Sequence, residues 1–126
     1  LNKDYYQESL TATAANGISL TKLLLDSNNP PTAIICSLDK FFIGCLQECK
    51  NQNLVVGKNI SVVGYNDYDY YLSSQNLTYI SHPLAQMGTD SVNILKKIEN
   101  GYHPDEVSKL IKPILHEGKS DGPLKI

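Results

Sequence analysis

This sequence of 126 residues has no surplus of basic side chains, no long apolar run and no cluster of metal ligands. Its formal net charge is −2, so the overall balance does not draw the chain to a nucleic-acid backbone or to an anionic membrane. No apolar stretch approaches the ~20 residues that a helix needs to span a bilayer, and we expect no signal peptide. The chain opens at Leu1 rather than Met, which suggests a piece of a longer protein. We expect one domain, located in the cytoplasm, without a membrane segment or a DNA-binding surface of its own.

The cysteines give no sign of a disulfide framework. Cys36, Cys45 and Cys49 are an odd count in a chain large enough to fold without disulfides, which favours a reducing compartment. A CxxC pair and a His-rich spacing are both missing, so a metal or redox centre is not indicated. Cys45 and Cys49 lie four residues apart and would share one face of a helix. We expect all three to be buried apolar thiols.

The sequence also lacks the patterns of common catalytic sites. His82, His103 and His116 have no serine, cysteine or carboxylate at a diagnostic spacing, so no catalytic triad is predicted. The run Gly-Lys-Ser at 118–120 resembles the end of a phosphate-binding loop, but Pro113 stands where the first glycine of that loop should be. We therefore expect no enzyme activity, no catalytic residue, no metal and no cofactor.

What the sequence does contain is an alternation of strand-type and helix-type segments. The patterns predict helices at residues 15–26, 39–50 and 83–99, and strands at 32–36, 60–63, 78–81 and 109–115. Residues 5–10 are a candidate for an additional first strand, and residues 68–76 are expected to form a loop or short helix. Pro113 places the last strand at an edge, because proline donates no ladder hydrogen bond. The alternation predicts the α/β class, a three-layer sandwich with a mostly parallel sheet.

The most informative stretch is residues 60–67, Ile-Ser-Val-Val-Gly-Tyr-Asn-Asp. Its mainly β-branched start predicts a core strand, and we expect Gly64 to end that strand because glycine adopts positive φ without a steric clash. The turn would then present Tyr65, Asn66 and Asp67 at the carboxyl edge of the sheet. Open α/β sheets bind ligands at that edge.

Two side chains are candidates for a ligand site at this edge. Asp39 follows one strand and precedes a helix, so it is expected to cap the helix, to face a ligand, or to do both. Asn66 carries a donor and an acceptor that suit a ligand hydroxyl or amide, although asparagine is also common in turns. The tyrosines nearby, Tyr65, Tyr68, Tyr70 and Tyr71, are an aromatic cluster that would line a ligand or a protein partner, or simply pack.

Several motifs together resemble the C-terminal part of LacI/GalR family transcriptional regulators. They are residues 31–39, Gly44, residues 60–67, Leu77-Thr78, His82-Pro83 and Met87-Gly88, in this order and spacing, within residues 13–121. The resemblance implies a periplasmic-binding-protein-like α/β fold. In that family a helix-turn-helix headpiece precedes a two-subdomain core, which binds a small effector such as a sugar or nucleobase and thereby changes operator affinity. Residues 1–126 would then be the C-terminal effector-binding and dimerisation subdomain, with the headpiece and most of the N-terminal subdomain absent.

The resemblance also suggests which residues contact the effector. Leu38 stands where the family often has a polar ligand-contacting residue, and the aspartate that follows it is retained as Asp39. Asn66 replaces an aspartate that commonly binds effector hydroxyls or amines, and Ala12 falls near the position of an aromatic wall. These departures predict a bulkier or less polar effector.

The resemblance further implies a homodimer that reaches operator DNA through the absent headpiece. Tyr70, Tyr71 and Leu72, together with the helix at 39–50, match regions that form the subunit interface in family dimers. An alternative is a sugar-binding transport protein of the same fold, which would need a secretory signal upstream. A small α/β enzyme is a third reading, but it lacks a nucleophile and base pair.

Overall fold

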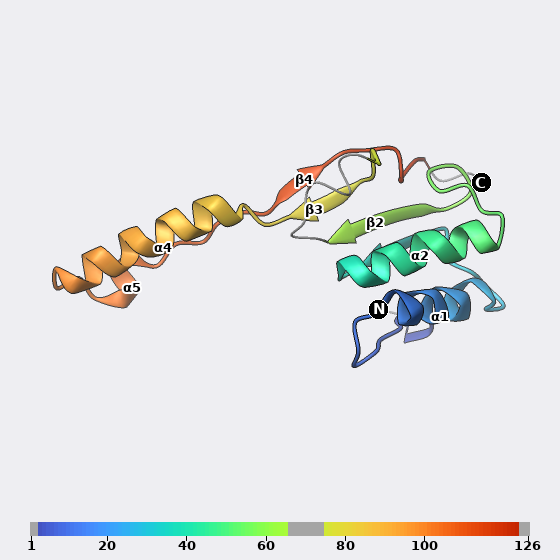
Figure 1. Ribbon diagram of the computed structural model, residues 1–126, viewed down its shortest axis with the longest axis horizontal. Helices are drawn as coiled ribbons and strands as arrows, with labels where there is room; N and C mark the ends of the chain where they lie inside the picture. The colour runs from blue at the N-terminus through green and yellow to red at the C-terminus, as the bar shows by residue number, and fades with distance from the viewer. Residues whose placement is uncertain (1–2, 66–74, 124–126) are drawn as a thin grey trace. The chain divides into compact units, whose positions relative to one another are not determined.

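A computed structural model describes residues 3–65 and 75–123 of the chain (Figure 1). Its helical elements are η1 (Lys3–Tyr5), α1 (Ala14–Leu25), α2 (Asp39–Asn51), α4 (Leu84–Glu99) and α5 (Pro104–Val107), and its strands are β1 (Ala33–Cys36), β2 (Ser61–Tyr65), β3 (Tyr79–Ser81) and β4 (Ile114–His116). The chain forms two compact units. The first unit is Leu1–Ser81 with Leu115–Ile126, and the second is His82–Ile114.

The sheet has the strand order β1-β2-β3-β4. β1 runs parallel to β2, with Cys36 opposite Gly64, and β2 runs parallel to β3, with Gly64 opposite Tyr79. The α/β class with a mostly parallel sheet is therefore confirmed. β4 is last in the order, so the edge position predicted from Pro113, which directly precedes β4, is also confirmed.

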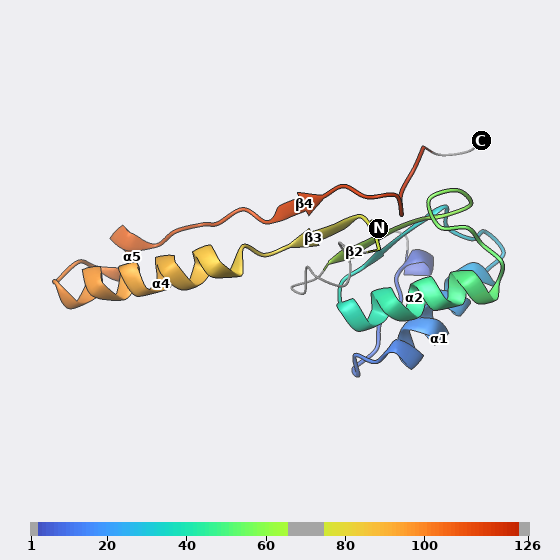
Figure 2. The same cartoon turned by 45° about the horizontal axis from the view of Figure 1, so that its top comes forward.

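In the first unit α2 packs against β1 and β2, α1 packs against α2, and of these two helices α1 begins with a side-chain cap. α1 starts after Thr13, whose Oγ1 accepts a hydrogen bond of 3.1 Å from the backbone N–H of Asn16. α2 connects the parallel strands β1 and β2 and so forms a βαβ unit with them. Figures 1 and 2 show α2 against β2, with α1 next to α2.

Two glycines bring α1 and α2 into close contact. A Cβ placed on Gly44 would lie 2.2 Å from the carbonyl oxygen of Ala14, and one placed on Gly17 would lie 2.8 Å from that of Phe41. The backbones therefore touch where side chains would normally separate them. This contact explains why Gly44, one of the family-like positions, carries no side chain.

The predicted role of Gly64 is wrong. β2 continues through Gly64 to Tyr65, and Gly64 is not among the glycines with positive φ. A Cβ at this position would lie 2.6 Å from the ring of Phe42, which is fully buried in the core. Gly64 therefore makes room for an aromatic ring of α2 and does not turn the chain.

The C-terminal segment is joined to the sheet through Ser120. The Oγ of Ser120 donates to the carbonyl oxygen of Val62 at 2.6 Å and accepts from the backbone N–H of Thr78 at 2.8 Å. The backbone N–H of Val62 donates to the carbonyl oxygen of Ser120 at 2.7 Å. Only 1% of Ser120 is exposed, so the serine of the Gly-Lys-Ser run that resembled a phosphate loop is a buried link between β2 and the residue before β3, while Lys119 is exposed.

The strand expected at residues 5–10 is wrong. η1 ends at Tyr5, and residues 6–13 form neither helix nor strand. The side chain of Ser9 exchanges hydrogen bonds with the backbone N–H and carbonyl of Thr11, so local side-chain bonds satisfy backbone groups that a ladder would otherwise use. The final strand is also shorter than predicted, because β4 begins only after Pro113.

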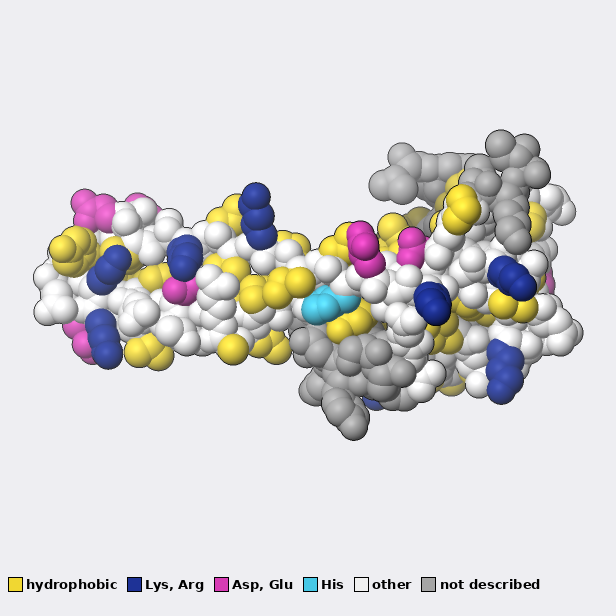
Figure 3. Space-filling model, turned by 90° about the horizontal axis from the view of Figure 1, so that it is seen from above, with side chains coloured by type: hydrophobic (Ala, Val, Ile, Leu, Met, Phe, Trp, Pro, Cys, Tyr) yellow, Lys and Arg dark blue, Asp and Glu magenta, His cyan; other side chains and the backbone are white. Residues whose placement is uncertain are grey.

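The second unit consists of α4 and α5. α4 ends where Asn100-Gly101 predicted, with Gly101 at φ +90°. None of the residues of α4 is buried, and several of its apolar side chains are exposed, such as Leu95 at 61%. Figure 3 shows hydrophobic side chains on the surface of this unit. Over the part of the chain that the structure describes, no helix is long and apolar enough to cross a bilayer.

Candidate functional site

The candidate site lies at the carboxyl end of β1. Because β1 and β2 are parallel, the segments that follow them leave the sheet at the same edge. After β1 the chain passes through Ser37 and Leu38 into α2, and after β2 the sequence continues to Asn66. Asn66 and the expected dimer residues Tyr70, Tyr71 and Leu72 lie outside the described residues, so these assignments remain predictions.

Asp39 acts as an anion at the start of α2. It is the first residue of that helix, and its Oδ1 accepts a hydrogen bond of 2.7 Å from the backbone N–H of Lys40. A carboxylate in this place stabilises the exposed N–H groups and the positive end of the helix dipole. The N-cap position itself belongs to Leu38, whose side chain makes no capping bond. The helix-start role expected for Asp39 is thus present.

A large groove runs along β1 on the open edge of the sheet. Its volume is about 980 Å³, and β1, α1, the start of α2 and residues 5–9 line it. Its apolar lining includes Leu24, Ile34, Ile35, Leu38 and Phe41. Ile35 is 78% exposed and Leu38 is 44% exposed, so apolar surface lies open along this strand. β1 pairs with β2 on one side only, and an unpaired strand edge of this kind is open to pairing with another strand.

Of the predicted effector residues that the structure describes, only some line this groove. Leu38 is one of the residues that line the groove, and its contact with an effector stays a prediction. Ala12 is exposed ahead of α1 and is not part of the groove lining. Asp39 is not part of the lining, although Leu38, directly before it, and Phe41, two residues after it, both are.

Sequence reasoning missed the part of the groove that residues 5–9 form. Tyr5 is held by Asn29, whose Nδ2 donates to the phenolic oxygen at 2.6 Å, and Ser9 is held by Asn16, whose Nδ2 donates to its Oγ at 2.9 Å. The phenolic oxygen of Tyr6 donates to Oε2 of Glu8 at 3.0 Å. Two adjacent tyrosines before a carboxylate were the available signal, but the segment was interpreted as a strand.

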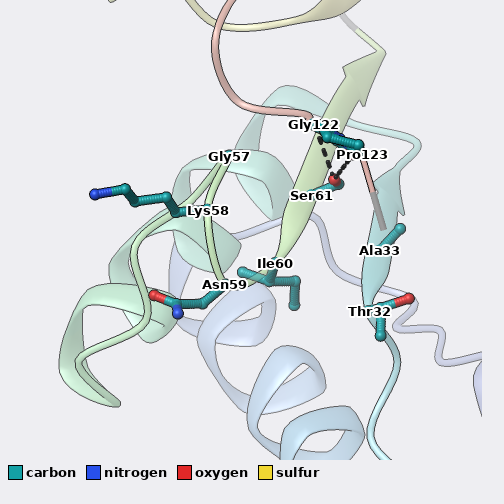
Figure 4. Close-up of a pocket in the computed structure, with 9 residues that line it drawn as sticks. All are labelled: Thr32, Ala33, Gly57, Lys58, Asn59, Ile60, Ser61, Gly122 and Pro123. Atoms are coloured by element: carbon teal, nitrogen blue, oxygen red, sulfur yellow. Dashed lines mark hydrogen bonds between the residues drawn. The ribbon is translucent and has the colours of Figure 1, made fainter. Parts of the chain in front are cut away.

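A second, smaller hollow lies at the opposite ends of the strands. Its volume is about 160 Å³, and it is lined by residues around Ser61 and Gly122 (Figure 4). The Oγ of Ser61 donates to the carbonyl oxygen of Gly122 at 3.3 Å and accepts from the N–H of Gly122 at 3.1 Å. These hydrogen bonds attach the C-terminal segment to β2, so the hollow has a structural explanation.

The three cysteines form a buried cluster of free thiols, as predicted. A hydrogen bond to Cys36 raises the pKa of Cys45 to about 12, and burial contributes to the same shift. The pKa of Cys49 is raised by its hydrogen bond to Cys45 and by burial. Thiols in this state are poor nucleophiles and poor metal ligands. Within residues 3–65 and 75–123, no group of three or more side chains is arranged to hold a metal ion.

Two of the histidines have structural roles. The Nε2 of His116 lies 2.8 Å from the Oγ of Ser81, and its ring stacks on Tyr79 with centroids 4.4 Å apart. These contacts connect β4 to β3. His103 caps α5, because its Nδ1 accepts a hydrogen bond from the backbone N–H of Asp105. The backbone N–H of His103 in turn donates to Oε2 of Glu106.

Comparison with known proteins gives consistent matches. The family described as periplasmic binding protein-like domain matches residues 2–120. The HTH-type transcriptional repressor CytR of Escherichia coli (strain K12) is 30% identical over 96 residues, which is 75% of this chain and 28% of that protein. The ribose operon repressor of Haemophilus influenzae is 32% identical over 87 residues, which is 67% of this chain and 26% of that protein.

Among solved structures, the dimeric Lac repressor with an 11-residue C-terminal deletion matches with a TM-score of 0.69 and 26% identity. The match covers 86% of this chain and 40% of that one. This chain therefore spans less than half the length of each of these proteins. The likeness concerns one part of a regulator.

Proposed function

The chain belongs to the periplasmic binding protein-like domain family and is similar to LacI-family repressors, and on this premise we propose that it is the effector-sensing part of a DNA-binding transcriptional regulator. The regulator is a cytoplasmic repressor that responds to a small molecule of the sugar or nucleobase class. Its operator-binding headpiece lies outside this chain. The chain itself is the C-terminal part of the effector-binding core.

The observation that carries this proposal is the family match over residues 2–120, together with the parallel pairing of β1 and β2. The segments that follow these two strands leave the sheet at the same end, which is where open α/β proteins bind ligands. Leu38 follows β1, and we assign Asn66, which follows β2 in the sequence, to the same site.

Effector binding would act by favouring one of two arrangements of the regulator. A ligand shifts such an equilibrium only as far as its affinities for the two arrangements differ. Linkage then requires that effector and operator alter each other's affinity by the same factor.

The proposal is tested by titrating the intact protein with a panel of sugars and nucleobases in a calorimeter. We expect at least one ligand to bind, and we expect Asn66→Ala to weaken the best ligand by about tenfold through the loss of one or two hydrogen bonds. Asn93→Ala, at an exposed position of α4, is the matched control and should leave the affinity unchanged. An unchanged affinity in Asn66→Ala would remove that residue from the site.

The alternative of a sugar-binding transport protein receives no support from the two relatives described above, which are both named repressors. An operator-binding assay separates the two functions. We expect the intact protein to retard a promoter fragment from its own operon, and the effector to change that retardation. A transport protein would bind the sugar and leave the DNA untouched.

A further inference from the structure

The second unit is connected to the first by two segments that start from neighbouring strands. The first unit consists of Leu1–Ser81 and Leu115–Ile126, so the chain leaves it after Ser81 and returns to it at Leu115. β3 ends at Ser81, and β4 spans Ile114–His116. The two strands are neighbours in the sheet, and Figures 1 and 2 show them side by side. Both connections to residues 82–114 therefore begin at one place in the first unit.

A side-chain hydrogen bond joins the two strands at this place. Nε2 of His116 lies 2.8 Å from Oγ of Ser81, the last residue before the chain leaves the first unit. The ring of His116 also stacks on Tyr79, with centroids 4.4 Å apart and an interplanar angle of 9°. Ser81 and Tyr79 are each 2% exposed, so water competes little for these contacts. The hydrogen bond and the stack hold the two connections next to each other.

The second unit has an internal contact of its own. Nζ of Lys109 lies 2.7 Å from Oδ2 of Asp90, and the side chain of Asp90 is 19% exposed. This ion pair attaches the segment that returns to the first unit to α4. A unit with internal contacts moves largely as one body, and the motion is taken up by a few residues at its connections. Those residues here directly follow Ser81 and directly precede Leu115.

From this geometry we propose that Ser81, His116 and Tyr79 form a clasp that limits the motion of residues 82–114 relative to the first unit. While the clasp is closed, the two connections stay together, and only the backbone dihedrals beyond them allow the second unit to turn. When the hydrogen bond between Ser81 and His116 breaks, the connections can separate and the range of motion increases. Ser81 and His116 are thus positioning residues. The inference goes beyond the proposed function, because it does not depend on which ligand the regulator binds.

The experiment measures distances between the two units in the intact protein by pulsed electron paramagnetic resonance. Nitroxide labels are attached at Lys50→Cys, at the exposed end of α2, and at Glu99→Cys, at the exposed end of α4. The native cysteines are buried free thiols, so the reagent should leave them unmodified, and the unsubstituted parent checks this. An excess of unlabelled parent is added so that the measured distances lie within one chain.

We expect Ser81→Ala to increase the fraction of molecules outside the parent's main distance peak about fivefold, the factor expected from the loss of one hydrogen bond. His116→Phe keeps an aromatic ring for the stack and loses the hydrogen bond, so it should match Ser81→Ala. His116→Ala loses both contacts and should exceed them.

Ser91→Ala is the matched control. Ser91 is an exposed residue of α4, and its Oγ donates to the carbonyl oxygen of Met87 in the same helix. This change should leave the distance distribution as it is in the parent. Circular dichroism checks that every labelled variant is folded.

The outcomes separate this inference from the proposed function. Distributions of folded Ser81→Ala and His116→Ala that match the parent would overturn the clasp, as would an equal broadening in Ser91→Ala. Should Ser81→Ala not fold, His116→Phe, at a half-buried position, decides the question by the same comparison. A regulator that bound no sugar or nucleobase would contradict the proposed function and leave the clasp in place.

Discussion

Single residues decide how closely α2 approaches the sheet, and Gly64 is the clearest example. The ring of Phe42 occupies the space that a Cβ at Gly64 would need, and that ring is fully buried. The sequence showed a glycine after a strand-type run, which is also the pattern of a turn. Only the position of Phe42 distinguishes the two interpretations.

We expect Gly64→Ala to destabilise the protein by about 1–3 kcal/mol, because the buried ring must move. Gly88→Ala is the matched control, since a Cβ on Gly88 meets nothing within 4 Å and alanine is the better helix former by about 0.5–1 kcal/mol. Urea denaturation of the intact protein, followed by circular dichroism, measures both effects. Equal stability of the two variants would contradict the packing role of Gly64.

The buried thiols predict a loss of stability at high pH. The pKa of Cys45 rises from 9.0 to about 12 in the folded protein, so the folded state holds its proton where the unfolded state has lost it. The stabilisation is complete below pH 9 and is lost as the pH rises from 9 towards 12. In that window this thiol lowers the free energy of unfolding by about 1.4 kcal/mol per pH unit.

Urea denaturation between pH 8 and pH 11 measures this dependence, with Cys45→Ala as the comparison. The variant should have a lower free energy of unfolding than the parent at pH 8. Above pH 9 that free energy should fall less steeply with pH in the variant, because it lacks the buried thiol whose pKa is raised in the folded state. Identical slopes for the two proteins would contradict the buried, protonated state of Cys45.

At the scale of elements, the link between the C-terminal segment and the sheet depends on Ser120. Ser120→Ala would leave the N–H of Thr78 and the carbonyl of Val62 without their side-chain partner in a buried place. We expect a loss of at least ~2 kcal/mol, because a buried polar group without a partner costs about 1–3 kcal/mol.

Ser19→Ala provides the control for Ser120→Ala. Ser19 is an exposed residue of α1, and its Oγ donates only to a backbone carbonyl one turn earlier. Alanine is favoured in a helix, so this change should lie within about 0.5 kcal/mol of the parent. The two variants are compared by the midpoint temperature of thermal unfolding. Equal midpoints for Ser120→Ala and Ser19→Ala would show that the hydrogen bonds of the Ser120 side chain contribute little to stability.

The elements themselves were largely predictable from local patterns. The starts and ends of α1, α2 and α4 agree with the sequence prediction within one residue, because caps, prolines and the Asn100-Gly101 stop act locally. The strands were less predictable, since a strand exists only where a neighbour completes its ladder. The residues at 5–10 show this, as their polar side chains bond to the local backbone and no strand forms.

At the scale of the whole molecule, a homodimer remains a prediction. The related Lac repressor structure is of a dimer, and the expected interface residues Tyr70, Tyr71 and Leu72 lie outside the described chain. We expect the intact protein to be dimeric in light scattering at micromolar concentration. Tyr71→Asp should shift it towards the monomer, because a charge buried in an interface without a partner is costly.

A matched surface change keeps the dimer experiment specific. Tyr102→Asp alters an exposed tyrosine in the second unit and should leave the oligomeric state unchanged. A monomer in both the parent and the variants, at concentrations up to the millimolar range, would exclude the proposed interface.

The sequence alone determined the α/β class, the helices, the buried thiols and the family-like motifs, because periodicity, caps and short-range spacing act along the chain. Tertiary structure decided that Gly64 makes room for the ring of Phe42 and that Ser120 joins β2 to the residue before β3. It also decided that residues 5–9, and not Ala12, line the groove beside β1. Each of these depends on which residues far apart in the chain become neighbours. Local patterns carry no record of that proximity, which arises only when the sheet and its helices pack together.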